Sequence, residues 1–123
     1  MELNITTTQE QDIEWQNWYE GDEYSISCTS IRFNEERKAF YLINDTDSVG
    51  TSVYATNPEN SKYPDATPHG IRLANALCKL FSITGATTTD TLLEQITAHI
   101  EANDCLTVSV GKNAKNHTVW TCA

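Results

Sequence analysis

The sequence has little positive charge and no long apolar run. Eight Lys and Arg residues stand against 17 Asp and Glu residues, and no segment approaches the roughly 18 apolar residues of a membrane span. The N-terminus has neither a basic patch nor the apolar stretch of a secretory signal. We therefore expect a cytoplasmic protein without a membrane partner. Its 123 residues correspond to one domain with a core that needs no metal or disulfide.

Recognisable catalytic and metal-binding patterns are also missing. The sequence has no Gly-rich phosphate loop, no H-E-x-x-H and no G-x-S-x-G. Adjacent acids such as Asp22 and Glu23 would point to opposite faces of a strand, which does not suit acid–base catalysis. The four cysteines form no C-x-x-C pair, and the three histidines have no ligand spacing. We expect structural thiols, no metal or other cofactor, and a protein that is not an enzyme.

The acidic residues are concentrated at the N-terminus. Residues 1–23 hold seven acids and no Lys or Arg, whereas residues 24–123 hold ten acids and eight bases. This asymmetry predicts an acidic arm over residues 1–23, which also carries Trp15, Trp18 and Tyr19, followed by a single domain over residues 24–123. Such an arm can dock on a basic partner or cover a basic groove of its own domain.

The first half of the domain has the pattern of β-strands. Two β-rich runs are joined by four polar residues, which predicts a hairpin with Phe33 opposite Lys38. A polar turn then leads to a further strand that ends before Asn57-Pro58. The expected strands span residues 24–33, 38–44 and 51–56.

Two helices are expected after a loop that contains all three prolines. Thr67 is a good N-cap, and Pro68 suits the first helical position. Apolar residues at spacings of three and four then continue towards Gly85, which closes the first helix. The second helix is expected from about Thr89 to Ala102, with an apolar stripe of leucine and isoleucine residues.

The closing segment predicts a second hairpin, formed by residues 105–110 and 117–122. We expect Val110 to pair with His117, which sets Cys105 opposite Cys122. The same alternation places Trp120 on the polar face of the hairpin. There it is available for ligand contact or for cover by the acidic arm or a helix.

The expected order is an arm, three strands, two helices and two strands. This order predicts an α+β protein, either with a small antiparallel sheet or as an OB-like five-stranded barrel with two helices between strands 3 and 4. Barrel closure depends on shear and bulges, which sequence periodicity does not reveal. Both architectures therefore remain open at this point.

Several segments together resemble small phage-encoded single-stranded-DNA-binding or recombination-accessory proteins of OB type. The resemblance spans about residues 20–122 and is carried by the segments Glu20–Ser27, Lys38–Asn44, Gly70–Phe81, Thr84-Gly85 and Leu106–Lys112. It implies a barrel that binds single-stranded DNA in the cytoplasm, or in the host cytoplasm for a phage-encoded protein.

Single-strand binding requires cations along the backbone and aromatic rings on which bases stack. Each stacked base contributes about 1–3 kcal/mol. Hairpin-tip cations and exposed rings are the natural candidates for these two roles. The predicted nucleic-acid-binding residues are Arg32, Arg37, Lys38, Tyr41, Tyr54, Lys112, Lys115 and Trp120.

The alternative function is that of an acidic inhibitor that mimics nucleic acid, similar to anti-CRISPR proteins. Its carboxylates would occupy the channel of a basic nucleic-acid-handling protein, and its aromatic residues would anchor in apolar pockets. The predicted partner-binding residues are Glu10, Asp12, Glu14, Trp15, Trp18, Tyr19, Glu20, Asp22 and Glu23. The sequence leaves open the identity of the target and the oligomeric state.

Overall fold

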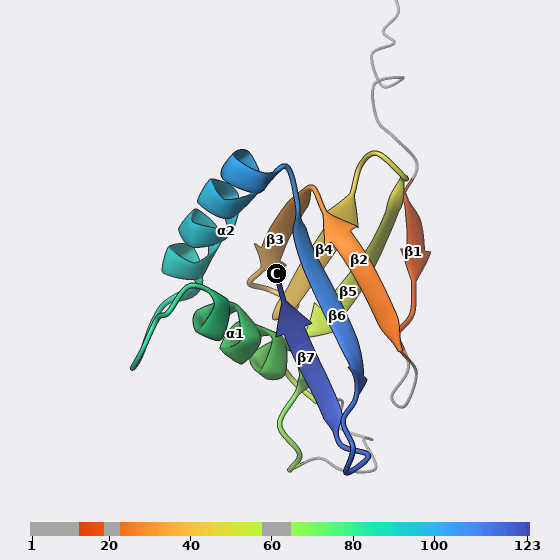
Figure 1. Cartoon of the computed structure of the whole chain (residues 1–123), viewed down its shortest axis with the longest axis vertical. Helices are drawn as coiled ribbons and strands as arrows, with labels where there is room; N and C mark the ends of the chain where they lie inside the picture. Colours follow the sequence, from red (N-terminus) through yellow and green to blue (C-terminus); the bar gives the residue numbers. More distant parts are fainter. Residues whose placement is uncertain (1–12, 19–22, 58–64) are drawn as a thin grey trace, which may run out of the picture.

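The computed structural model describes residues 13–18, 23–57 and 65–123, which form an α+β fold of two sheets and two helices (Figure 1). Sheet A consists, in this order, of β1 (Glu14–Gln16), β5 (Val49–Tyr54), β4 (Ala39–Asn44) and β3 (Ser30–Asn34). Sheet B consists of β2 (Tyr24–Cys28), β6 (Leu106–Lys112) and β7 (Thr118–Cys122). The predicted α+β class is confirmed. The expected closed five-stranded barrel is not formed by the described strands, because β5 and β7 do not pair.

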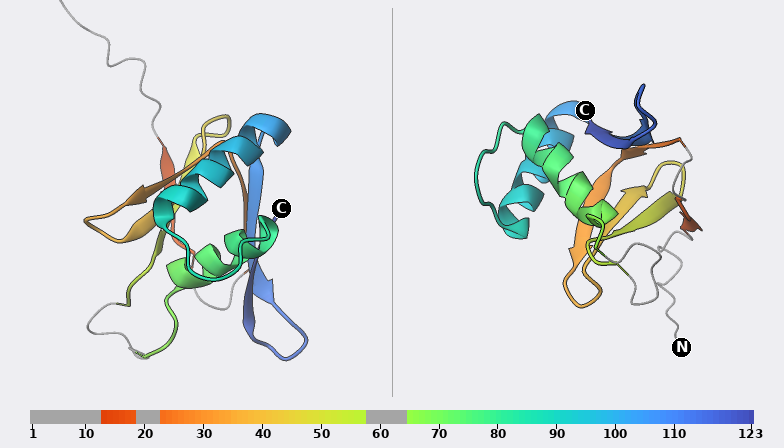
Figure 2. Two further views of the ribbon diagram at one scale, coloured as in Figure 1. Left: turned by 90° about the vertical axis from the view of Figure 1, so that its left-hand side faces the viewer. Right: turned by 90° about the horizontal axis from the view of Figure 1, so that it is seen from below.

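One apolar core lies between the two sheets and the helices. Helix α1 (His69–Leu80) packs against β7 and β5, and α2 (Thr89–Asn103) packs against β3 and β6. The helices therefore cover one side of the space between the sheets (Figure 2). Within the described residues, neither helix is long and apolar enough to cross a membrane. The core consists of Ile26, Cys28, Ile31, Phe40, Leu42, Val53, Leu73, Leu77, Leu92, Ile96, Leu106 and Val108.

The expected strand over residues 24–33 is divided between the two sheets. Only Thr29 separates β2 from β3, and it passes the chain from sheet B to sheet A. Its backbone N–H donates to the carbonyl of Ile43 at 2.8 Å, and its hydroxyl donates to Asp45 Oδ2 at 3.0 Å. These bonds fix the bend, which is why one β-rich run serves both sheets.

The first hairpin has a different register from the one expected. Phe33 pairs with Phe40 and not with Lys38, because residues 35–38 form a four-residue turn before β4 begins. Asn34 stabilises this turn by accepting a hydrogen bond from the Arg37 N–H at 2.9 Å. The offset of two residues leaves every side chain on its expected face, since side chains alternate with a period of two. The third expected strand also begins earlier, at Val49.

The predicted register of the last hairpin is also wrong, and this error has larger consequences. Val110 pairs with Trp120 and not with His117. Strand β6 continues to Lys112, and Asn113 then closes the tip by accepting backbone hydrogen bonds from Lys115 at 2.9 Å and His117 at 3.0 Å. The offset of three residues moves each side chain of β7 to the other face of the sheet.

This change of face corrects three expectations. Trp120 lies on the same face as Val110 and packs against the core, so it is not on the polar face of the hairpin. Val119, which the expected pairing would have buried, is 37% exposed. Cys122 pairs with Val108, so Cys105 and Cys122 are not opposite each other.

The two helices were located correctly, but the ends of α1 differ from the prediction. Pro68 is the N-cap in place of Thr67. The helix ends at Leu80, five residues before Gly85, because Ser82 adopts a left-handed conformation with φ of 56°. Ser82 and Ile83 then donate backbone hydrogen bonds to carbonyls of the last helical turn, a Schellman arrangement.

The second helix follows its local signals closely. Thr88 caps its start by accepting a hydrogen bond from the Thr91 N–H at 3.2 Å. Asp104 ends it in a left-handed conformation with φ of 71°. The predicted span of about 89–102 is thus confirmed within one residue.

Part of the predicted acidic arm belongs to the folded sheet. Strand β1 pairs in parallel with β5, and Glu14 donates its N–H to the carbonyl of Ser48 at 2.8 Å. The hydroxyl of Thr51, which is fully buried, donates to the carbonyl of Gln16 at 2.8 Å. A buried polar side chain of sheet A therefore depends on β1 for its partner. Residues 1–12 and 19–22 of the predicted arm lie outside the described residues.

Candidate functional site

The outer face of sheet A brings together three residues predicted to bind nucleic acid. Register pairs Arg32 with Tyr41 and Tyr41 with Ser52, so these side chains form a row across β3, β4 and β5. Tyr54 lies two residues further along β5, on the same face. Phe40 and its neighbours on the opposite face form the core, which directs this row outwards.

Strand β1 adds a fourth aromatic or cationic side chain to this face. Trp15 pairs with Gly50 of β5, and its ring lies edge-to-face against Tyr41 with the ring centroids 5.7 Å apart. Gly50 favours this contact, since a Cβ there would lie only 3.0 Å from the Trp15 ring and 3.1 Å from the Ile13 side chain, and both would have to shift slightly. Glycine thus lets an indole reach across β5 to Tyr41.

We call these residues the aromatic face: Trp15, Arg32, Tyr41, Ser52 and Tyr54. Trp15 is 51% exposed and Tyr54 is 47% exposed, which is high for rings anchored on strands. The outward positions of the four strands carry no Asp or Glu. The face therefore combines accessible π-surfaces with a guanidinium group and no opposing charge. This combination suits stacking of flat, negatively charged ligands.

A second aromatic cluster joins Trp18, which follows β1, to Tyr24 of β2 and Trp120 of β7. Trp18 stacks on Tyr24 with centroids 5.4 Å apart and contacts Trp120 with centroids 5.8 Å apart. Trp120 Nε1 donates a hydrogen bond to His69 Nδ1 at 3.3 Å, at the start of α1. Trp120 is thus half-buried between the Trp18 segment and a helix, as expected of a ring that these elements cover.

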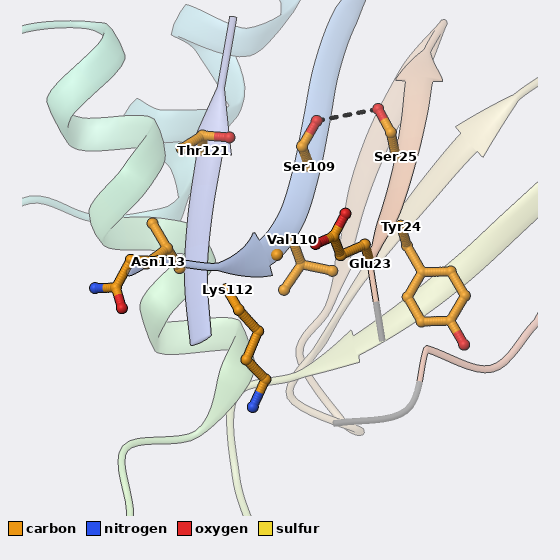
Figure 3. Close-up of a pocket in the computed structure, with 10 residues that line it drawn as sticks. Glu23, Tyr24, Ser25, Ser109, Val110, Lys112, Asn113 and Thr121 are labelled. Atoms are coloured by element: carbon orange, nitrogen blue, oxygen red, sulfur yellow. Dashed lines mark hydrogen bonds between the residues drawn. The ribbon is translucent and has the colours of Figure 1, made fainter. Parts of the chain in front are cut away.

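The outer face of sheet B carries hydroxyl groups and no aromatic ring. Ser25 and Ser109 form a hydrogen bond of 3.0 Å across β2 and β6, and Thr121 continues the row on β7 (Figure 3). These residues line a shallow depression of about 600 Å³. Glu23 and Lys112 also line it, so its two charges are of opposite sign. Its one described ring is Tyr24, which already stacks on Trp18, so the depression lacks the gathered rings and the uniform charge of the aromatic face.

The remaining predicted cations lie at the tips of the two hairpins. Arg37 and Lys38 follow Glu35 and Glu36 in the turn between β3 and β4, so this tip carries equal numbers of both charges. Lys115 lies at the tip between β6 and β7. The structure does not bring these cations into the row of Arg32 and Tyr41; their role in binding stays a prediction.

The residues predicted for the inhibitor function are described only in part. Glu14, Trp15, Trp18 and Glu23 lie in described segments, and the two carboxylates are on exposed residues. Trp15 and Trp18 are already engaged with rings of the domain. The predicted residues Glu10, Asp12, Tyr19, Glu20 and Asp22 lie outside the described residues.

Sequence reasoning did not single out two cations of helix α1. Arg72 and Lys79 line a hollow between α1 and β7 together with Trp120. Their spacing of seven residues is the one signal in the sequence that places them on one side of a helix. That signal is common on solvated helices, and the hollow itself exists because α1 packs against β7.

All four cysteines are free thiols, and two of them are held protonated. Burial, with a smaller contribution from the neighbouring Cys122 and Cys105, raises the pKa of Cys28 from 9.0 to about 12. Burial also raises the pKa of Cys122 to about 12. Such thiols are poor nucleophiles at neutral pH. Among the described residues, no group of three His, Cys, Asp or Glu side chains is arranged to hold a metal ion.

Comparisons with known proteins give no significant match. No protein-family model matches the sequence, and neither curated proteins nor solved structures match the chain.

Proposed function

We propose that this protein binds single-stranded DNA on the aromatic face of sheet A. The observation that supports this proposal most directly is the exposure of Trp15 and Tyr54 on the same face as Tyr41 and Arg32. Folding gains nothing from leaving these rings in water, because each loses part of the roughly 1.5–3 kcal/mol that burial of a large apolar side chain contributes. Exposed rings gathered on one face are typical of an interaction surface.

The arrangement of rings suits unpaired bases better than a duplex. The ring of Trp15 lies over Gly50, and the small side chain of Ser52 leaves a hollow on β5 that Trp15 and Tyr54 also line. Bases of a single strand can enter such a surface and stack, whereas paired bases present their edges and backbone. Arg32 is placed to contact a phosphate or to stack on a base.

The strand connectivity supports an OB-like architecture for this domain. The bent segment of β2 and β3 contributes to both sheets, β4 and β5 follow as a meander, and β6 returns beside β2 after the helices. OB-folds are partly open five-stranded barrels that bind oligonucleotides on the face of strands 2 and 3 and with the loops after strands 1 and 4. Counting β2 and β3 as one strand, those strands are β4 and β5. The loops are the two hairpin tips, between β3 and β4 and between β6 and β7.

A second candidate function is binding to a basic nucleic-acid-handling protein. Glu14 and Trp15 are adjacent and exposed on β1, an edge strand of sheet A. A carboxylate beside an accessible indole is a suitable anchor for a cationic partner surface. The two functions differ in the sign of the partner: the first attracts nucleic acid, and the second attracts basic protein.

The test of the first function is fluorescence anisotropy with a labelled single-stranded oligo-dT of about thirty nucleotides, titrated with the full chain at low and moderate salt. We expect saturable binding that salt weakens, since phosphate contacts release counterions. Trp15→Ala should weaken binding by about 1–3 kcal/mol.

The matched control is Ser27→Ala, which removes an exposed side chain from the outer face of sheet B and lies in neither the aromatic face nor the hollow beside α1. We expect this variant to bind like the wild type. Absence of saturable binding by the wild type would refute the DNA-binding function. Capture of a basic nucleic-acid-handling protein, lost in Glu14→Gln, would then support the second candidate.

A further inference from the structure

A cationic hollow lies between α1 and β7, beside Trp120. It has a volume of about 420 Å³ and contains two cationic residues, Arg72 and Lys79, but no Asp or Glu. In a chain with a formal net charge of −9, a concave site with two cations and no acid is unusual. The lining consists of Thr67, Arg72, Asn75, Ala76, Lys79, Thr118, Val119 and Trp120.

The two cations are positioned to meet separate anionic groups. Seven residues of α-helix span about 10 Å along the axis, so Arg72 and Lys79 lie on one side of α1 two turns apart. Arg72 Nε donates to the carbonyl of Thr67 at 3.2 Å, which orients the guanidinium and leaves its terminal nitrogens for a ligand. Within the described part of the chain, neither cation forms an ion pair. Both are therefore available to an incoming anion.

Two tryptophans connect this hollow to the aromatic face. Trp120 lines the cationic hollow, and its ring contacts Trp18. Trp18 in turn lines a neighbouring hollow of about 500 Å³ together with Trp15, Ser52 and Tyr54. The described residues therefore give a continuous surface from the exposed rings of sheet A, over Trp18 and Trp120, to the cations of α1.

We propose that the hollow between α1 and β7 binds phosphate groups of the single strand whose bases stack on the aromatic face. This inference rests on the proposed function for its physiological ligand. The chemistry it requires is that of a chain of phosphates, which Arg72 and Lys79 contact at successive points and which Asn75 and Thr118 can assist by hydrogen bonding. The strand thereby gains affinity from α1 that the aromatic face alone does not provide.

The double variant Arg72→Gln/Lys79→Gln tests this site by the salt dependence of oligo-dT binding. Loss of two phosphate contacts should reduce the slope of log Kd against log salt by about 1.4. The ratio of the Kd values at 200 and 50 mM salt should then fall about sevenfold. Arg72→Lys/Lys79→Arg, which keeps both charges, should retain the wild-type slope.

The matched control changes the net charge equally without touching the hollow. Gln95→Glu/Ala98→Glu adds two negative charges at exposed positions of α2. It should leave the slope unchanged. An equal loss of slope in the control, or an unchanged slope in Arg72→Gln/Lys79→Gln with circular dichroism showing a folded protein, would overturn the proposal.

A second measurement separates failure of the site from failure of the proposed function. Inorganic tripolyphosphate, added to the ¹⁵N-labelled full chain, should shift the indole N–H signal of Trp120 and the side-chain amide signals of Asn75, and the shifts should disappear in the double Gln variant. These shifts without any oligo-dT binding would retain the anion site and reject the DNA-binding function. Oligo-dT binding without tripolyphosphate shifts, and with an unchanged salt slope in the double variant, would reject the site alone.

Discussion

The outer faces of the two sheets carry opposite chemistry, although both sheets bury their inner faces in the same core. Sheet A presents Trp15, Tyr41 and Tyr54 with Arg32, whereas sheet B presents a row of serine and threonine hydroxyls. Sheet B is what folding alone would produce on a solvated face, because its polar residues satisfy one another or water. The difference indicates that the rings of sheet A serve a purpose other than stability.

The sheets also differ in their thiols. Two cysteines lie in strands of sheet B, Cys28 and Cys122, and Cys105 directly precedes β6. The strands of sheet A contain none. Titration of a buried thiol therefore acts on sheet B first, which gives a way to perturb one sheet by pH alone.

The largest expected effect comes from a substitution in the core that the two sheets share. Leu42 of β4 is fully buried, and Leu42→Ala should lower the free energy of unfolding by about 2–5 kcal/mol. Because one core joins the sheets, amide hydrogen exchange should show that β6 loses protection together with β4. Urea unfolding measures the total loss.

If amide protection in Leu42→Ala were lost in sheet A alone, the two sheets would not share a single core. Val119→Ala serves as the surface comparison. Its side chain is 37% exposed on sheet B, and its effect on the free energy of unfolding should stay within about 0.5 kcal/mol.

An exchange of side chains between the two outer faces sharpens the comparison of their chemistry. Tyr54→Ser gives sheet A a hydroxyl in place of a ring and should weaken oligo-dT binding by about 1–3 kcal/mol. Ser27→Tyr places a ring on the outer face of sheet B beside Thr107, where the outward strand positions carry no other ring. We expect Ser27→Tyr to leave the affinity unchanged, as measured by anisotropy.

Thermal unfolding of the same two variants provides the control. Tyr54 and Ser27 are both exposed, so neither change should lower Tm by more than a few degrees. If Ser27→Tyr strengthened binding as much as Tyr54→Ser weakened it, the outer face of sheet B would be part of the interface and the contrast would fail.

The smallest expected effect is on the pH dependence of stability, and it comes from the thiol of Cys28. It is absent at neutral pH and grows at alkaline pH. Burial, together with the neighbouring thiols, raises the pKa of Cys28 from 9.0 to about 12. The folded protein thus holds the thiol proton more tightly than the unfolded chain does. The resulting stability is fully present below pH 9 and is lost as the pH rises through about 12.

Urea unfolding between pH 7 and pH 11, under reducing conditions, measures this dependence. Cys28→Val keeps an apolar side chain at the buried position and removes the titrating group. We expect the variant to lose less stability than the wild type above pH 9. Equal losses of stability in the two proteins would show that Cys28 does not cause the decrease in stability above pH 9.

Local signals in the sequence were sufficient for some elements and not for others. Helix α2 was predicted within one residue because its cap, its apolar stripe and its end all act within a few residues. Helix α1 ended early because Ser82, and not Gly85, takes the left-handed position of the Schellman motif. Glycine is the commonest residue at this left-handed position. No sequence pattern indicates that a serine occupies it instead.

The registers of the two hairpins show why strand pairing is harder to predict. In the last hairpin, the side chain of Asn113 draws the Lys115 and His117 amides into a tight tip, which shifts the pairing by three residues. That odd offset exchanged the faces of Trp120 and Val119. The first hairpin was wrong by an even offset, so the expected pairing still put its side chains on the faces that they occupy.

The candidate site shows the same division. Arg32, Tyr41 and Tyr54 were predicted as binding residues in three expected strands, and register places them on one face. Trp15 was assigned to the acidic arm, because nothing local indicates that a three-residue strand pairs in parallel with β5. Such a pairing is a contact between distant parts of the chain.

The sequence by itself determined the α+β class, the positions of the helices and the alternation of side chains within the first hairpin. These properties follow from interactions between residues near one another in the chain. Only the tertiary structure decided which face Trp120 occupies, that Trp15 joins the aromatic face, and that Arg72 and Lys79 share a hollow with β7. Each of these depends on pairing or packing between distant segments, where the offset of one turn residue changes which side chains meet.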